Sequence, residues 1–165
     1  MPLTIFIVGL PSSGKSTVAA LLSCKINSSL RFKSFLIDAD HLGKFSVLPM
    51  PHDYSLSARN IRGLQLTNLV LWISHLDYIP VVAAIGQPPT LIDHWRVSIP
   101  GFFLVHLKAD IEVCTSRDYK STYTKDNVVG KDIPYVSPRT PDLEFDVSEK
   151  SAIDIVDLIY SRLSF

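Results

Sequence analysis

Apolar residues fall into short blocks that alternate with longer stretches of helical periodicity. Continuous apolar runs predict four buried strands, at residues 3–8, 34–37, 79–85 and 101–107. Apolar positions spaced three and four apart predict helices that begin at residue 15, cover 56–75, cover 91–96, begin at 111, and cover 148–164. Strands that alternate with helices favour an α/β fold in which helices cover both faces of a parallel sheet.

Two segments follow neither period. Residues 41–55 contain Pro49 and Pro51 and are predicted to be irregular. Residues 118–141 are polar, rich in Lys, Asp, Thr and Pro, and long for a connection inside a compact domain. Such a segment is either a plain surface loop or a lid over an active site. The chain is long enough for one ordinary domain, which we expect to span 1–165.

The first predicted strand leads into the pattern G-x-x-x-x-G-K-[ST], which is typical of a phosphate-binding P-loop. Its glycines let the backbone curl so that N–H groups point at phosphate oxygens, and the following helix adds its positive N-terminal dipole. A lysine in this position reaches the β- and γ-phosphates, and the next hydroxyl can ligate Mg²⁺. The expected nucleotide-binding residues are Gly9, Leu10, Pro11, Ser12, Ser13, Gly14, Lys15, Ser16 and Thr17. This motif favours the lid interpretation of 118–141, because phosphoryl transfer needs water to be excluded.

Two carboxylates, Asp38 and Asp40, follow the second predicted strand. One of them can support Mg²⁺ and the other can accept a proton from an attacking hydroxyl. Asp40 is the expected base, and Asp38 is expected to join Ser16 at the metal. The alternative interpretation is a helix N-cap next to a solvent-facing acid. The third strand ends without an Asp, so the usual acidic partner of Mg²⁺ is missing there. We therefore favour the interpretation of Asp38 and Asp40 as catalytic residues, together with Lys15.

Other polar side chains are candidates for substrate contacts. Arg59, Asn60 and Arg62 lie at the start of a predicted helix and can hold an anionic acceptor, although each alone also fits a solvated helix face. Arg117 and Lys120 open the lid-like segment, where an arginine can stack on adenine and a lysine can follow the moving phosphoryl charge. Aromatic and histidine side chains are expected to pack rather than react, among them Tyr123, Tyr135 and His106.

Composition limits the remaining choices. Sixteen basic and sixteen acidic residues cancel, so neither a nucleic-acid footprint nor a polybasic membrane surface is indicated. Cys24 and Cys114 are expected to be reduced, partly buried thiols rather than a disulfide. The longest apolar stretch, 69–85, is interrupted by polar residues and a proline, and the N-terminus enters a core strand without a basic leader. We therefore expect a cytoplasmic protein.

Taken in order, the motifs resemble the adenylylsulfate kinases, which phosphorylate the ribose 3′-hydroxyl of adenylylsulfate with ATP. The segments that carry the resemblance are Gly9 to Thr17, Ile37 to Asp40, Asn60 to Arg62, Val81 to Pro88, and Cys114 with Arg117, Asp118, Lys120 and Tyr123, followed by Pro134, Tyr135 and Pro138 through Leu143. The resemblance implies a three-layer P-loop kinase with strand order 2-3-1-4-5, Mg²⁺ as cofactor, ATP and ADP as ligands, and a possible homodimer.

Departures from the family pattern fall mainly on the acceptor side. Gly43 and Thr90 stand where the family has arginines, and Val128 stands where the family has a phenylalanine that stacks on the acceptor's adenine. Losing such a stack costs on the order of 1–3 kcal/mol. The prediction is therefore an ATP-dependent kinase acting on a hydroxyl of a small nucleotide-type acceptor. The alternatives are a kinase of the same family with another acceptor, such as a modified nucleoside diphosphate, and a nucleotide-binding module without turnover.

Overall fold

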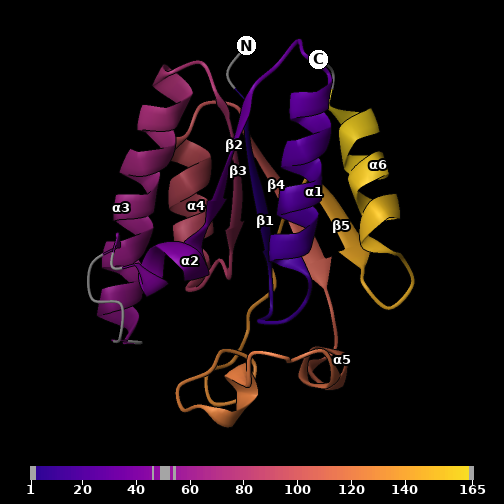
Figure 1. The fold of residues 1–165 in the computed structure, drawn as a ribbon. Coiled ribbons are helices and arrows are strands. Elements are labelled where there is room, and N and C mark those ends of the chain that lie inside the picture. Colours follow the sequence, from indigo (N-terminus) through magenta and orange to yellow (C-terminus); the bar gives the residue numbers. More distant parts are fainter. Residues whose placement is uncertain (1–2, 46, 49–52, 54, 164–165) are drawn as a thin grey trace.

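A five-stranded parallel sheet forms the centre of the molecule in the computed structural model, which describes residues 3–45, 47–48, 53 and 55–163 (Figure 1). Its strands lie in the order β2-β3-β1-β4-β5, which confirms the predicted topology. They are β1 (Thr4–Gly9), β2 (Ser34–Asp38), β3 (Ile79–Ala84), β4 (Phe102–Lys108) and β5 (Leu143–Asp146). All four neighbouring pairs are parallel, so every strand ends at the same edge of the sheet.

Helices cover both faces of this sheet, as the alternating pattern predicts (Figure 1). One face carries α1 (Lys15–Ser28) and α6 (Ala152–Arg162), and the other carries α2 (Ala39–Lys44), α3 (Leu56–His75) and α4 (Pro89–Ser98). The short helix α5 (Ile111–Ser116) and a 3₁₀ turn, η1 (Thr122–Thr124), lie beyond the carboxyl ends of the strands. Within these described residues no helix combines the length and the hydropathy needed to cross a membrane.

The central strand β1 explains why the sheet has two cores. All six of its residues are buried, and successive side chains point to opposite faces. Ile5 and Ile7 join the core under α1 and α6, whereas Phe6 and Val8 join the core under α3 and α4. Full burial of one such side chain contributes roughly 1.5–3 kcal/mol, so β1 fixes both layers on the sheet.

Several predicted boundaries are wrong in detail. Residues 39–44 form α2, although 41–55 was predicted to be irregular; the Asp38 side chain accepts hydrogen bonds from two backbone N–H groups at the helix start and stabilises it. The last helix begins at Ala152 rather than at residue 148, because Ser151 and Asp154 form a capping box there. The position of β5 was not predicted. Cys24 is exposed rather than partly buried, because it lies on the outer side of α1, whereas Cys114 is buried; both are free thiols. Pro49, Pro51 and the predicted helix end at 164 lie outside the described residues.

Candidate active site

The predicted P-loop lies where β1 ends and α1 begins. At Gly9 a Cβ atom would come within 2.5 Å of the Leu107 carbonyl oxygen, so only glycine fits next to β4. Gly14 is the N-cap of α1 with φ 96°, a left-handed conformation that glycine adopts without strain. Because this N-cap has no side chain, it leaves the first N–H groups of α1 to a ligand, as anion binding at a helix N-terminus requires.

Lys15 is the most buried charged group of the loop. Its side chain is 7% exposed, and its Nζ donates a hydrogen bond to the Leu10 carbonyl oxygen at 2.5 Å. Burial lowers the pKa of Lys15 from 10.5 to about 8, although the negative charges of Asp40 and Asp38 oppose the shift. Close by, the buried Ser13 hydroxyl has no hydrogen-bond partner among the described residues. The loop therefore holds a buried polar group that a phosphate would satisfy.

Asp38 and Asp40 are both near enough to Lys15 for their charges to act on its pKa. Asp38 is buried, and one of its oxygens, Oδ1, accepts the backbone N–H groups of Asp40 and His41 at 2.9 and 3.2 Å. Asp38 is thus the N-cap of α2, as in the alternative interpretation, and the cap uses only one of its two carboxylate oxygens. Asp40, in the first turn of α2, is exposed. The two carboxylates consequently differ in environment: Asp40 is exposed, whereas Asp38 is buried and one of its oxygens already belongs to the cap.

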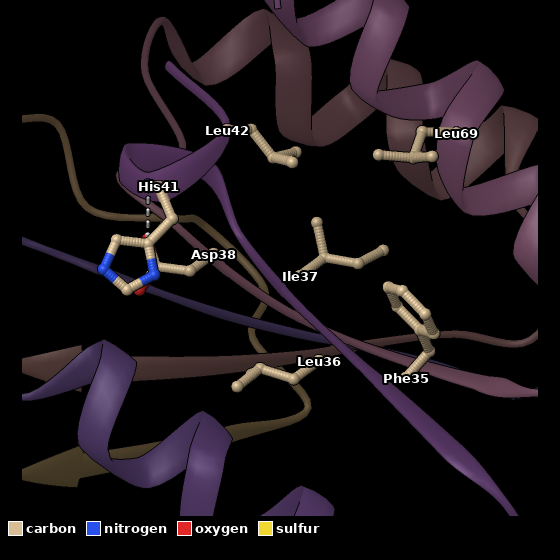
Figure 2. Close-up of a pocket in the computed structure, with 7 residues that line it drawn as sticks. All are labelled: Phe35, Leu36, Ile37, Asp38, His41, Leu42 and Leu69. Atoms are coloured by element: carbon tan, nitrogen blue, oxygen red, sulfur yellow. Dashed lines mark hydrogen bonds between the residues drawn. The ribbon is translucent and has the colours of Figure 1, made fainter. Parts of the chain in front are cut away.

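A cavity of about 150 Å³ lies beside β2, between this edge strand and helices α2 and α3 (Figure 2). Its lining is mostly apolar and consists of Phe35, Leu36, Ile37, Asp38, His41, Leu42 and Leu69. Of the predicted site residues only Asp38 belongs to this lining, and Lys15 and Asp40 do not. The phosphate-handling groups therefore lie outside this cavity, at the carboxyl edge of the sheet.

The lid-like segment 118–141 contacts several other elements of the protein, mainly through hydrogen bonds. Hydrogen bonds link Ser12 Oγ to Asp118 Oδ1 at 3.1 Å and Tyr123 Oη to the Pro11 carbonyl at 2.9 Å. Further hydrogen bonds run from Arg59 Nη2 to the Asn127 carbonyl at 3.2 Å, from Gln87 Nε2 to the Val136 carbonyl at 2.7 Å, and from Arg96 Nη2 to the Thr140 carbonyl at 2.6 Å. The segment thus lies against the P-loop, the start of α3, the loop after β3 and α4.

A third hydrophobic cluster joins this segment to the P-loop. Its buried members are Leu10, Cys114, Tyr123, Val128 and Val129. Gly130 has φ 93°, and a Cβ there would come within 2.5 Å of Leu10 Cδ2, so the segment approaches the loop closely at this point. Val128, which the family resemblance placed at the acceptor, is buried in this cluster with 7% of its surface exposed.

The remaining predicted contacts are distributed around the same edge. The charge of Lys120 reaches Lys15 and lowers its pKa. Arg117, which ends α5, donates to the Val147 carbonyl at 3.2 Å, beside the loop after β5. Arg62 donates to the Asp53 carbonyl at 2.6 Å, and Asn60 is half-buried on α3. Arg59, Asn60 and Arg62 therefore lie together at the start of α3, with Arg59 facing the lid-like segment.

Sequence reasoning missed two residues that touch the P-loop. Tyr123 packs in the third cluster, as predicted, but its hydroxyl also bonds the loop backbone. Asp118 accepts from the loop and from its own segment. Both belong to the spaced pattern C-x-x-R-D-x-K-x-x-Y at 114–123, and that pattern was the signal that pointed to them.

A divalent cation would find oxygen ligands of the right kind here. Ser16, in the first turn of α1, brings a hydroxyl, and Asp38 keeps one carboxylate oxygen that takes no part in the helix cap. Hard oxygen donors of this kind suit Mg²⁺ shared with phosphate oxygens. In the described part of the chain no group of three or more His, Cys, Asp or Glu side chains is arranged to hold a metal unaided. These residues therefore fit a metal that arrives with a nucleotide.

Several known proteins are similar in sequence to this chain. A sequence profile of the adenylylsulphate kinase family matches residues 1–146. An adenylyl-sulfate kinase of Vibrio parahaemolyticus is 27% identical over 170 residues, which cover 98% of this chain and 82% of that protein. A cytidine diphosphoramidate kinase of Campylobacter jejuni is 26% identical over 171 residues, which cover 99% and 97%. The chain also matches the bifunctional CysN/CysC enzymes of Mycobacterium tuberculosis, but it spans only 27% of their length.

The fold agrees with a solved structure throughout. The Mycobacterium tuberculosis APS kinase CysC, in complex with AMPPNP and APS, has a TM-score of 0.85 and 24% sequence identity to this chain, covering 97% of this chain and 96% of that one. The likeness extends over the whole sheet and both helix layers, so it establishes the three-layer architecture.

Proposed function

The chain belongs to the adenylylsulphate kinase family, and we propose that it is an ATP-dependent kinase that transfers the γ-phosphoryl group of ATP to a hydroxyl of a small nucleotide-type acceptor. The observation that carries this proposal is the position of Lys15. It lies buried inside a P-loop, within reach of the charges of Asp38, Asp40 and Lys120. A P-loop lysine with carboxylates near it suits phosphoryl transfer, because catalysis of that reaction rests on positioning and on charge stabilisation.

We assign the donor side to the P-loop. Residues 9–17 hold the phosphates of ATP, and Lys15 stabilises the negative charge that develops on the transferring group. Ser16 and the second carboxylate oxygen of Asp38 would hold Mg²⁺, which would supply positive charge for the phosphate oxygens. Arg117 supports the nucleotide base from the lid-like segment, and Lys120 follows the phosphoryl charge.

Asp40 is the proposed general base. Its carboxylate is exposed, whereas that of Asp38 is buried and occupied by the helix cap, so only Asp40 can meet an acceptor hydroxyl directly. Arg59, Asn60 and Arg62 are the proposed acceptor contacts, since they gather at the start of α3 close to the lid-like segment. Their two guanidinium groups suit an acceptor that carries anionic phosphate or sulfate.

One observation favours an acceptor other than adenylylsulfate. Val128 is aliphatic and packs among Leu10, Cys114 and Tyr123, so it presents no ring face on which an adenine can stack. A relative of similar identity is named a cytidine diphosphoramidate kinase. The second candidate is therefore a kinase of a modified cytidine diphosphate, with the donor side unchanged.

The test is acceptor-dependent ADP release. Purified protein with MgATP is offered adenylylsulfate, cytidine diphosphoramidate, other nucleoside diphosphate derivatives, or no acceptor. The proposed kinase releases ADP with at least one acceptor, and the Lys15→Ala variant does not. Turnover only with a cytidine derivative would select the second candidate. Tight ATP binding without turnover on any acceptor would instead indicate a nucleotide-binding module.

A further inference from the structure

Two hydrogen bonds reach the P-loop from one short stretch of the lid-like segment. Asp118 Oδ1 accepts from Ser12 Oγ at 3.1 Å, and Tyr123 Oη donates to the Pro11 carbonyl at 2.9 Å. The partners are 106 and 112 residues apart in the sequence, yet both contacts fall on neighbouring residues of the loop. Figure 1 shows this stretch, in orange, next to the turn between β1 and α1. Residues 11–12 of the P-loop are therefore held in place by hydrogen bonds from a segment outside the loop.

The Asp118 carboxylate joins the two contacts into one unit. Its second oxygen, Oδ2, accepts the backbone N–H of Tyr123 at 2.7 Å, so the same side chain holds both Ser12 and the turn that presents Tyr123. Burial acts to raise the pKa of Asp118, but the hydrogen bonds from Tyr123 and Ser12 outweigh it and hold the pKa below its usual value. Asp118 is thus a carboxylate, and an acceptor through both oxygens, at neutral pH.

Tyr123 anchors the other end of this unit. Its ring is buried in the third cluster beside Leu10 and Cys114, and it lies in the 3₁₀ turn that Ser121 caps. The ring is therefore fixed by packing while its hydroxyl meets the loop backbone. Because packing holds the Tyr123 ring in one orientation, the hydrogen bond from its hydroxyl can hold the loop backbone in one position.

The held part of the loop is also its least relaxed part. Ser12 has φ 60°, in the left-handed region that residues other than glycine adopt only when their surroundings hold them there. The Ser13 N–H donates to the Leu10 carbonyl at 3.2 Å, so the N–H groups that a phosphate would meet come from the residues after it. A shift at residues 11–12 would therefore change the direction of those N–H groups.

We propose that Asp118 and Tyr123 are positioning residues of the nucleotide site. They hold Pro11 and Ser12 in the geometry that aims the following N–H groups at phosphate. The same contacts fix the distance between the loop and the cations on either side of Asp118, namely Arg117 and Lys120. Neither residue touches the reacting atoms; both act through the loop. The nucleotide part of this inference rests on the proposed function.

The first test compares two tyrosines of the same segment. Tyr123→Phe removes only the hydroxyl, which bonds Pro11 and also meets the Cys114 thiol, whereas Tyr119→Phe removes a hydroxyl from a side chain that is 86% exposed. Calorimetric Kd values are measured for ADP and for a non-hydrolysable ATP analogue, together with KM and kcat. Loss of one buried hydrogen bond should weaken nucleotide binding about five- to tenfold in Tyr123→Phe. Saturating nucleotide should restore kcat to within about threefold, and Tyr119→Phe should match the wild type.

A structural role gives a different result. If Tyr123 only stabilises the fold, the variant melts at a lower temperature but binds nucleotide with unchanged Kd, and the proposal is overturned. An equal loss of affinity in Tyr119→Phe would also overturn it. If the wild type itself fails to bind either nucleotide, the proposed function fails, and that result is distinct from wild-type binding that Tyr123→Phe leaves unaltered.

The second test is a double-mutant cycle between Ser12→Ala and Asp118→Asn. If the Asp118 effect passes through Ser12, then Asp118→Asn weakens nucleotide binding less in the Ser12→Ala background than in the wild type. If the two substitutions reduce nucleotide affinity by independent factors, the effect of Asp118 does not pass through Ser12, and the proposal is contradicted. Asp126→Asn is the matched control, because it removes a charge from an exposed position in the same segment.

Discussion

The Nζ atom of Lys15 lies 2.5 Å from the carbonyl oxygen of Leu10, so the lysine hydrogen-bonds its own loop. That contact satisfies one of the three donors of an ammonium group that is otherwise removed from water. Burial consequently lowers the pKa of Lys15 to about 8. A bound phosphate would reverse this effect, because an adjacent negative charge favours the protonated lysine.

Nucleotide affinity should therefore depend on pH above about 8. Below the lowered pKa, Lys15 is already charged and binding moves no proton; above it, binding must take up a proton, so Kd rises with pH, by at most about tenfold per unit. The terminal phosphate of ATP is already fully ionised in this pH range, so it does not contribute to the proton uptake. Calorimetry at pH 8.5 in buffers of different ionisation enthalpy should detect the uptake. Lys15→Arg keeps its charge and should lose the dependence; a flat wild-type profile would contradict the lowered pKa.

Asp38 and Asp40 should differ in their effects on stability, because only Asp38 caps a helix. Asp38→Ala removes the cap of α2 and should lower the free energy of unfolding by about 1 kcal/mol, whereas Asp38→Asn retains a capping oxygen and should not. Asp40→Asn changes an exposed side chain and should leave the free energy of unfolding within about 0.5 kcal/mol. Loss of a general base should nevertheless lower its kcat by about 10²–10⁴. Chemical denaturation and steady-state rates check the pair, and full activity in Asp40→Asn would exclude it as the base.

Strands were predictable where burial on both faces leaves a continuous apolar run. β1 and β3 are of this kind. β5 is only four residues long, and its polar Glu144 and Asp146 alternate with Leu143 and Phe145, so no run marks it. The brief helix α2 likewise has no apolar repeat. It depends on the cap that Asp38 provides, which the sequence analysis held only as the alternative to a metal-binding role.

The candidate site was predictable only as far as local motifs reach. Lys15 and its loop lie within one pattern, and the common edge of a parallel sheet was enough to place Asp38 and Asp40 beside it. The bond from Tyr123 to Pro11 spans 112 residues and depends on how α5 and the third cluster pack. The pattern at 114–123 includes Tyr123 but does not tell which residue its hydroxyl meets, because tertiary packing decides that contact.

Packing between α3 and α4 should be sensitive to one glycine. A Cβ at Gly63 would collide with both methyl carbons of Leu91, so Gly63→Ala should lower the free energy of unfolding by about 1–3 kcal/mol. Gly43→Ala is the matched control: it is also helical, and an added Cβ meets nothing within 4 Å. Alanine should therefore stabilise that position by roughly 0.5–1 kcal/mol. Urea unfolding followed by circular dichroism measures both changes, and equal effects would show that contact with Leu91 does not decide them.

Arg59 should distinguish acceptor binding from nucleotide binding. Its guanidinium lies at the start of α3 and donates to the Asn127 carbonyl, between the helix and the lid-like segment. With the acceptor that supports turnover, Arg59→Gln should lower kcat/KM for that acceptor by about 10- to 100-fold, the loss expected for a hydrogen bond to a charged group. The KM for ATP should stay within about twofold, because the P-loop is untouched. Arg162→Gln, at the exposed end of α6, controls for the loss of one positive charge. A rise in the KM for ATP with the acceptor unaffected would reassign Arg59 to holding the lid-like segment rather than the acceptor.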